Sequence, residues 1–162
     1  MRIVALAVFS LALQCSAQAS SQASGVARQT VEMAILLAGR EAAGLPIVLA
    51  PVAPDEASRG IEAWILPGQE GNAARIVVYS ESDVFRCASD PDRLNYQCLL
   101  KLASIIVHEA WHWRHGPGEA GAYDAQIAFL TNHGGSSLQI SGVRLARGRV
   151  LAAQQAIERR RK

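Results

Sequence analysis

The feature that most constrains the fold is a long stretch without glycine or proline that ends abruptly. From Leu94 to His115 no helix breaker occurs, and this length suffices for about six helical turns. The sequence Gly116-Pro117-Gly118 follows and must interrupt the helix, because proline lacks a backbone N–H and glycine favours turns. The spacing therefore predicts one long helix, a sharp bend, and a second helix from Glu119 that packs back against the first.

A helix is also expected near the N-terminus. Gly44 and Pro46 would end it. Apolar residues recur at helical spacing ahead of that stop, at Val31, Ala34, Leu37 and Ala38.

Three short apolar segments between the helices predict a small antiparallel sheet. Residues 47–54 are broken by two prolines, so they can form at best a short or edge strand. Residues 61–67 and 74–80 are rich in β-branched and aromatic residues and flank a glycine-containing turn, which is typical of a hairpin. We expect Arg75–Ser80 to be an edge strand to which a peptide could add.

The remaining elements follow the strands. We expect Asp90 or Asp92 to cap the long helix near Arg93, and Ser136 or Ser137 to cap a last helix that runs into the basic C-terminal tail. The sequence thus predicts an α+β domain with an N-terminal helix, a small sheet, the long helix and two C-terminal helices.

The first 19 residues have the composition of a secretory signal peptide. Arg2 precedes a short apolar run, and Ala17-Gln18-Ala19 is a small-x-small cleavage signal. We expect cleavage after Ala19, a flexible lead over residues 20–27 and a single domain over residues 28–162, in a secreted or periplasmic protein. The alternative is a lipoprotein anchored through Cys15, which Gln14 disfavours because a small residue is expected there.

Removal of the signal peptide would leave two cysteines, Cys87 and Cys98. In an oxidising compartment an even pair favours a disulfide, and such a short loop would contribute about 2–3 kcal/mol. The formal charge of +2 is too small to indicate a nucleic-acid partner. The apolar run of the first segment is shorter than the roughly 20 residues of a membrane span. We expect a monomer.

Four residues around the bend predict a zinc site. His108 and His112 lie four apart, so on a helix their rings project from one face toward a common point. Glu109 stands beside the first histidine, where a general base is needed. Glu119, directly after the bend, would supply the third ligand from the next helix.

Two other residues compete for the third position. His115 lies on the same helix as the histidine pair, and three ligands from one helix close a site poorly, so it is expected to be a neighbouring group, a transition-state donor or plain surface. Asp124 comes five residues after Glu119, about 140° around the helix, so both cannot face the metal.

The sequence His108-Glu109-x-x-His112 with Glu119 resembles the gluzincin branch of the zinc metallopeptidases, over roughly Val77 to Leu130. The resemblance implies a compact zincin-like core, His108, His112 and Glu119 as ligands of one Zn²⁺, and Glu109 as the base. It excludes the metzincins, which need a histidine where this chain has Gly118. Many gluzincins carry an aspartate where this chain has Tyr123, so the group that orients each histidine is unassigned.

The function expected from this site is hydrolysis of peptide bonds in a peptide or protein substrate. Tyr123 and His115 are the candidate donors to the developing oxyanion, and Asp124 is a further candidate neighbour of the ligands. Two alternatives use the same residues: a zinc amidase that acts on cell-wall peptides, and a catalytically inactive, zinc-stabilised binding domain.

Overall fold

The computed structural model describes residues 24–51, 62–68, 73–91 and 95–161. The expected signal peptide with its cleavage point after Ala19, Cys15, and the first part of the expected lead lie outside these residues. So do most of the turn between the second and third strands and the expected helix start at residues 92–94.

The fold is α+β, as the sequence predicts. Residues 24–38 form an N-terminal helix, which already includes residues 24–27 of the expected lead. The elements that follow are η1 (Gly39–Glu41), β1 (Ile47–Ala50), β2 (Ala63–Leu66), β3 (Arg75–Tyr79), α2 (Asp83–Ala88), α3 (Tyr96–His115), α4 (Glu119–Asn132) and α5 (Ser137–Arg160).

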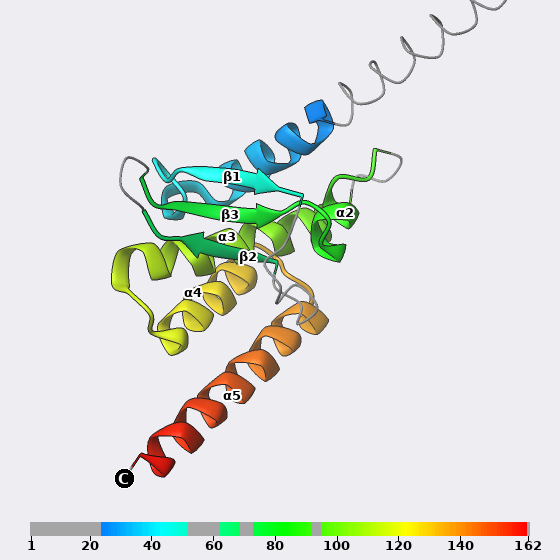
Figure 1. Cartoon of the computed structure of the whole chain (residues 1–162). Coiled ribbons are helices and arrows are strands. Elements are labelled where there is room, and N and C mark those ends of the chain that lie inside the picture. The colour runs from blue at the N-terminus through cyan, green and yellow to red at the C-terminus, as the bar shows by residue number, and fades with distance from the viewer. Residues whose placement is uncertain (1–23, 52–61, 69–72, 92–94, 162) are drawn as a thin grey trace, which may run out of the picture.

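Within the described residues, the sheet has three strands in the order β1-β3-β2 (Figure 1). β2 and β3 pair antiparallel, as a hairpin should, but β1 pairs parallel with β3. The sheet is therefore mixed, and the expectation of a purely antiparallel sheet is wrong.

The expectation that Arg75–Ser80 forms an edge strand is also wrong. β3 is the central strand, and β1 and β2 are the edges. The physical reason is visible in the burial of β3, where Ile76, Val77 and Val78 are all buried. Three consecutive buried apolar residues fit an interior strand better than a solvent-exposed edge.

The start of the long helix differs from expectation as well. α3 begins at Tyr96, because the side chain of Asn95 caps it by accepting a hydrogen bond from the backbone N–H of Cys98. Earlier in the chain, Asp83–Ala88 form the short helix α2, and Ser82 caps it. The sequence pattern did not predict this helix. The Cys87–Cys98 disulfide joins α2 to the first turn of α3, and such a bond is compatible with an oxidising compartment.

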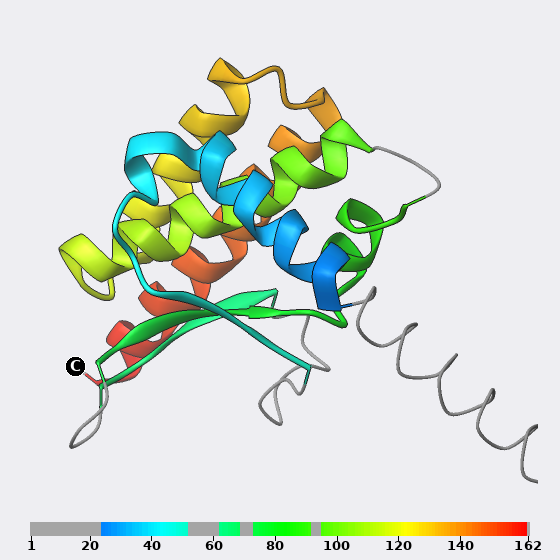
Figure 2. The ribbon, with the colours of Figure 1, turned by 90° about the horizontal axis from the view of Figure 1, so that it is seen from above.

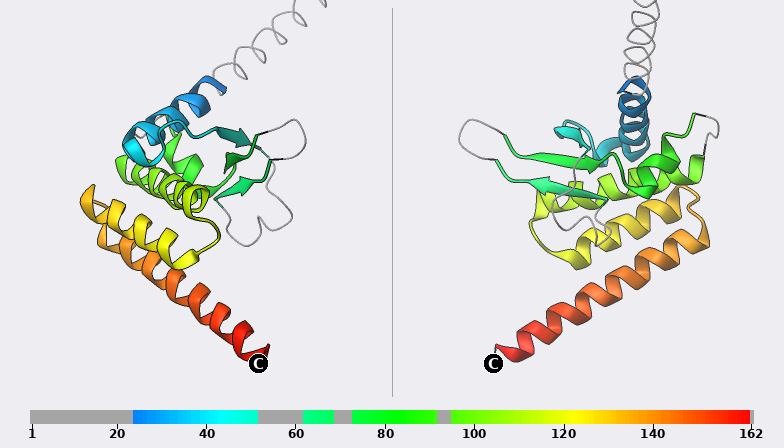
Figure 3. Two further views of the ribbon diagram at one scale, coloured as in Figure 1. Left: turned by 90° about the vertical axis from the view of Figure 1, so that its left-hand side faces the viewer. Right: turned by 45° about the vertical axis from the view of Figure 1, so that its right-hand side comes forward.

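The helices form layers on one side of the sheet. α3 and the N-terminal helix lie over one face of the sheet (Figure 2). α4 packs on α3, and α5 packs on α4 (Figure 3). The capping box of Ser136 and Gln139 starts α5, and its C-terminal half projects from the body with exposed side chains from residue 152 onward (Figure 1).

The core lies between α3 and the elements around it. Its fully buried members include Ala34, Val78, Leu100, Leu102, Ile106 and Leu130. α3 supplies many of the core residues and contacts both β2 and α4. This packing holds the face of α3 that carries the histidines in place. Among the described residues, no helix combines the length and apolar character needed to cross a membrane.

Candidate metal centre

The bend between α3 and α4 brings the expected ligands together. α3 ends at His115, and Gly116 has φ 88° and ψ −163°, a backbone conformation that is almost confined to glycine. Pro117 and Gly118 complete the bend, and Glu119 is the first residue of α4. The Gly116-Pro117-Gly118 sequence therefore folds the chain back within three residues, as predicted.

The lack of a side chain at Gly121 lets α4 approach α3 closely. The indole of Trp111 lies against Gly118 and Gly121 of the returning chain. A Cβ built at Gly121 would lie 2.6 Å from Trp111 Cε2 and closer still to Cζ2, well inside van der Waals contact. Glycine at position 121 thus allows the helix pair to pack at the distance that brings Glu119 to the histidines.

Two imidazoles and one carboxylate converge on a single point. His108 Nε2 lies 3.2 Å from His112 Nε2. Glu119 Oε2 lies 3.6 Å from His108 Nε2, and Glu119 Oε1 lies 3.7 Å from His112 Nε2. One ligand atom from each residue lies within 4.8 Å of the others, so the group can hold a metal ion.

The tautomer of His112 is fixed by its second ring nitrogen. His112 Nδ1 lies 2.9 Å from the Gly116 carbonyl oxygen. A carbonyl can only accept, so Nδ1 carries the proton and Nε2 keeps its lone pair for the convergence point. Such a bond to the other ring nitrogen is the usual way in which a histidine ligand is oriented.

The second ring nitrogen of His108, Nδ1, differs from that of His112. His108 Nδ1 is buried and makes no hydrogen bond within the described part of the chain. The amide of Gln126 is close enough to raise the pKa of the ring. Gln126 is only 4% exposed, and its Nε2 donates to Ser104 Oγ at 3.2 Å.

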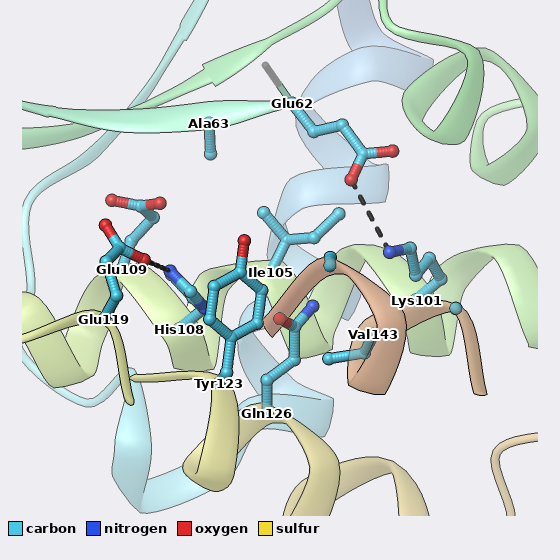
Figure 4. Close-up of a pocket in the computed structure, with 12 residues that line it drawn as sticks. Glu62, Ala63, Lys101, Ile105, His108, Glu109, Glu119, Tyr123, Gln126 and Val143 are labelled. Atoms are coloured by element: carbon cyan, nitrogen blue, oxygen red, sulfur yellow. Dashed lines mark ion pairs between the residues drawn. The ribbon is translucent and has the colours of Figure 1, made fainter. Parts of the chain in front are cut away.

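The hydroxyl of Ser104 decides which way the Gln126 amide points. Ser104 Oγ donates to the carbonyl oxygen of Lys101 at 2.7 Å, so it is left to accept from a donor, which must be the NH₂ group of Gln126. The amide oxygen of Gln126 is thereby turned to the other side. In Figure 4 that oxygen is on the side of His108.

Burial governs the charges at the centre. Desolvation, together with the charge of neighbouring His112, lowers the pKa of His108 to about 4, against the opposing effect of Gln126. Desolvation and the nearby Glu119 raise the pKa of Glu109 to about 8. Glu109 therefore holds its proton to a higher pH than an ordinary glutamate does.

Tyr123 stands over the histidines, one helical turn after Glu119. Its ring packs edge-on against His108, with centroids 4.6 Å apart. Burial and then the charges of Glu119 and Glu109 raise the pKa of its hydroxyl, so it stays a protonated donor at neutral pH. The hydroxyl points into the cleft (Figure 4).

The other two expected neighbours lie elsewhere. His115 is exposed and its ring lies against Trp111, with centroids 4.8 Å apart. Asp124 is exposed and pairs with Arg147 of α5 at 2.8 Å. Neither residue belongs to the convergence point, because His115 faces Trp111 of its own helix and Asp124 faces Arg147 of α5.

Between the described residues, two hollows lie beside the centre, and Glu109 and Glu119 line both. The larger, of about 400 Å³, extends along α3 to Glu62 and Lys101. The smaller, of about 330 Å³, is lined by Ile65, His112, Gly116 and Pro117. The spacing of Lys101, Ile105 and His108 on α3 could have indicated their shared face, but nothing in the sequence indicates Glu62.

Comparison with known proteins adds no relative. No protein-family model, curated protein or solved structure matches the chain. The site therefore has to be interpreted from its own geometry.

Proposed function

We propose that the protein is a zinc-dependent peptide-bond hydrolase of the gluzincin type. The observation that carries the proposal is the convergence of His108, His112 and Glu119 beside the part-buried Glu109. A structural zinc site is normally closed by four protein ligands, whereas a catalytic site has three and an open position. The described part of the chain supplies three, next to a cleft.

The donor set fits zinc better than the harder divalent cations. Two imidazole nitrogens with one carboxylate suit zinc, whereas calcium and magnesium prefer oxygen ligands. In tetrahedral zinc, bond lengths of about 2.0–2.2 Å put neighbouring ligand atoms about 3.3–3.6 Å apart. The two imidazole nitrogens lie 3.2 Å apart, and one ligand atom from each of the three residues lies within 4.8 Å of the others, so small side-chain movements would bring all three to one ion.

Each residue has a defined task in the proposal. When bound, zinc supplies a water of near-neutral pKa and polarises the carbonyl of the scissile bond. Glu109 takes a proton from the attacking water and passes it to the leaving amine. The hydroxyl of Tyr123 donates to the developing oxyanion, while Trp111 keeps the helix pair closed around Glu119.

In the proposal, a neutral acceptor orients each of the two histidines. For His112 the acceptor is the Gly116 carbonyl. For His108 we assign the amide oxygen of Gln126, since the Ser104 hydroxyl holds the amide in that orientation. This acceptor takes the place of the aspartate that the family pattern would put at Tyr123.

A substrate peptide can add to β2. Tyr79 N–H donates to Glu62 O, and Ala63 pairs with Val78. In an antiparallel ladder the bonded pairs alternate, so the N–H and C=O groups of Ala63 and Ile65 face away from β3. Among the described residues β2 has no strand on that side. Its side chains at these positions line the two hollows.

The location that fits the proposal is outside the cytoplasm. The Cys87–Cys98 disulfide favours an oxidising compartment. The expected signal peptide agrees with it, and mass measurement of the mature protein would test cleavage after Ala19.

Metal analysis and digestion of an unbiased peptide library test the proposal. We expect one zinc per chain, lost in His108→Ala, His112→Ala and Glu119→Ala. Glu109→Gln should keep zinc and lower the rate of cleavage by about 10²–10⁴-fold. The exposed His115→Ala is the matched control and should keep both.

Cleavage that persists unchanged in Glu109→Gln would rule out the proposed base. Zinc bound without any cleavage would instead favour the zinc-stabilised binding domain, and cleavage restricted to cell-wall peptides the amidase.

A further inference from the structure

The larger hollow ends at a pair of opposite charges that the proposed chemistry does not use. Lys101 of α3 and Glu62, directly before β2, lie across from each other at the end remote from Glu109 (Figure 4). Lys101 Nζ is 3.7 Å from Glu62 Oε2, and the side chains are 25% and 30% exposed. Both charges are thus largely withdrawn from water.

The two charges are only loosely joined. Their separation is longer than a hydrogen bond of about 2.7–3.2 Å, and within the described part of the chain neither charged group has a closer partner. Burial raises the pKa of Glu62 in spite of Lys101. A part-buried pair without good hydrogen bonds contributes little to stability, and it leaves a donor and an acceptor facing the same space.

The walls of this space leave room for a side chain. Small residues from two elements line it, namely Ala63 of β2 and Gly142 and Ala146 of α5. Ile105 and Val143 add apolar surface. The hollow can therefore hold the aliphatic part of a side chain whose end reaches the charged pair.

Strand addition would deliver such a side chain. A peptide paired with Ala63 and Ile65 points every second side chain toward α3. The residue opposite Ala63 would enter the larger hollow, and a residue two positions away would enter the smaller one beside Ile65 and Pro117. Only the first of these positions meets Glu62 and Lys101.

We propose that the larger hollow is a substrate subsite that selects a carboxamide side chain, asparagine or glutamine. The inference rests on the proposed function, because it assumes a peptide bound along β2. An acidic side chain that reaches Lys101 is repelled by Glu62, and a basic one that reaches Glu62 is repelled by Lys101. A carboxamide satisfies both, since its oxygen accepts from Lys101 and its NH₂ donates to Glu62.

Peptide digestion with charge-neutralised variants tests the subsite. The wild-type protein should cleave peptides with asparagine or glutamine at one position about ten- to a hundred-fold better than those with leucine, glutamate or lysine there. Glu62→Gln should move the preference to acidic side chains, and Lys101→Met should move it to basic ones. The exchanged pair Glu62→Lys with Lys101→Glu should restore carboxamide preference, because the amide can turn round.

Binding of the same peptides to zinc-loaded Glu109→Gln separates the two proposals. Carboxamide preference in binding without wild-type cleavage would support the subsite and refute the hydrolase. Cleavage with the same preference in the wild type and both single variants would refute the subsite and leave the hydrolase standing. Unfolding curves and zinc content of each variant identify any that has failed to fold, and the exchanged pair then decides the question.

Discussion

His112 Nδ1 donates a hydrogen bond to the carbonyl oxygen of Gly116 at 2.9 Å. The same glycine ends α3, with φ 88°, so one residue both breaks the helix and orients a proposed metal ligand. The bend is thus part of the candidate metal centre, in addition to reversing the chain toward Glu119.

Gly116→Ala should weaken metal binding. An alanine at this φ costs about 1–3 kcal/mol, and relief of that strain rotates the carbonyl away from His112. We expect zinc affinity to fall about 10–100-fold, measured by competition with a chromophoric chelator. Gly134→Ala is the matched control, since Gly134 also has positive φ (76°) with open space around it. Gly134→Ala should lose stability but keep its zinc affinity. Equal zinc affinities in Gly116→Ala and Gly134→Ala would contradict this role of Gly116.

Gly121→Ala should destabilise the protein although it lies inside a helix. Replacement of a helical glycine by alanine ordinarily stabilises by about 0.5–1 kcal/mol. At position 121 the new methyl group would overlap the Trp111 ring, and overpacking costs about 1–3 kcal/mol or more. Gly148 of α5 has nothing within 4 Å, so Gly148→Ala should show the ordinary gain. Urea unfolding compares the two, and a stabilised Gly121→Ala would mean that the helices are not in close contact there.

Gln126→Met should lower zinc affinity about 10–100-fold. Methionine has a similar volume but supplies no strong acceptor for His108 Nδ1. Gln126→Glu keeps an acceptor and should restore most of the affinity, which a purely structural role of Gln126 would not explain. Nitrogen NMR of the zinc-loaded protein should find the His108 proton on Nδ1 in the wild type. Unchanged affinity in Gln126→Met would remove Gln126 from the site.

The stability of the metal-free protein should change with pH because of Glu109. Burial raises the pKa of this carboxyl from an ordinary 4.5 to about 8 in the fold, so between these values the folded state binds more protons than the unfolded state. Stability contributed by this group therefore falls as pH rises through that window, by at most about 1.4 kcal/mol per pH unit. Glu109→Gln does not have this loss, so its free energy of unfolding should exceed that of the wild type by a margin that grows as the pH rises.

Chemical unfolding in a chelator between about pH 5 and pH 8 measures this difference. His108, whose pKa is lowered to about 4, contributes in the opposite direction: the stability it contributes falls as pH drops from about 6.5 toward 4. Because both proteins contain it, the comparison cancels much of its effect. A constant difference across the range would show that the fold does not raise the pKa of Glu109.

Local pattern was enough for the elements that carry the histidines. A long stretch without glycine or proline, followed by Gly116-Pro117-Gly118, predicted α3, its end and the start of α4. The i, i+4 spacing of His108 and His112 fixed their common direction, because a helix has a constant rotation per residue. The start of α3 was less predictable, since Asn95 lies close to other residues that can also cap a helix.

The sequence predicted where the strands lie along the chain, but not how they are ordered in the sheet. Each of β1, β2 and β3 falls within an expected segment, because strand propensity and turns are local. The parallel pairing of β1 with β3 depends on where the connecting chain crosses, and period-2 reasoning does not contain that information. The consecutive apolar residues Ile76, Val77 and Val78 were a sequence signal of a buried, interior strand.

The sequence by itself determined which way each ligand points from its own helix. Only the tertiary structure decided which groups meet: it brings Glu119 to the histidines, turns Gln126 toward His108, and diverts Asp124 to Arg147. The physical reason is that periodicity fixes directions within one element, whereas distances between elements depend on packing. Here that packing rests on contacts such as Trp111 against Gly121.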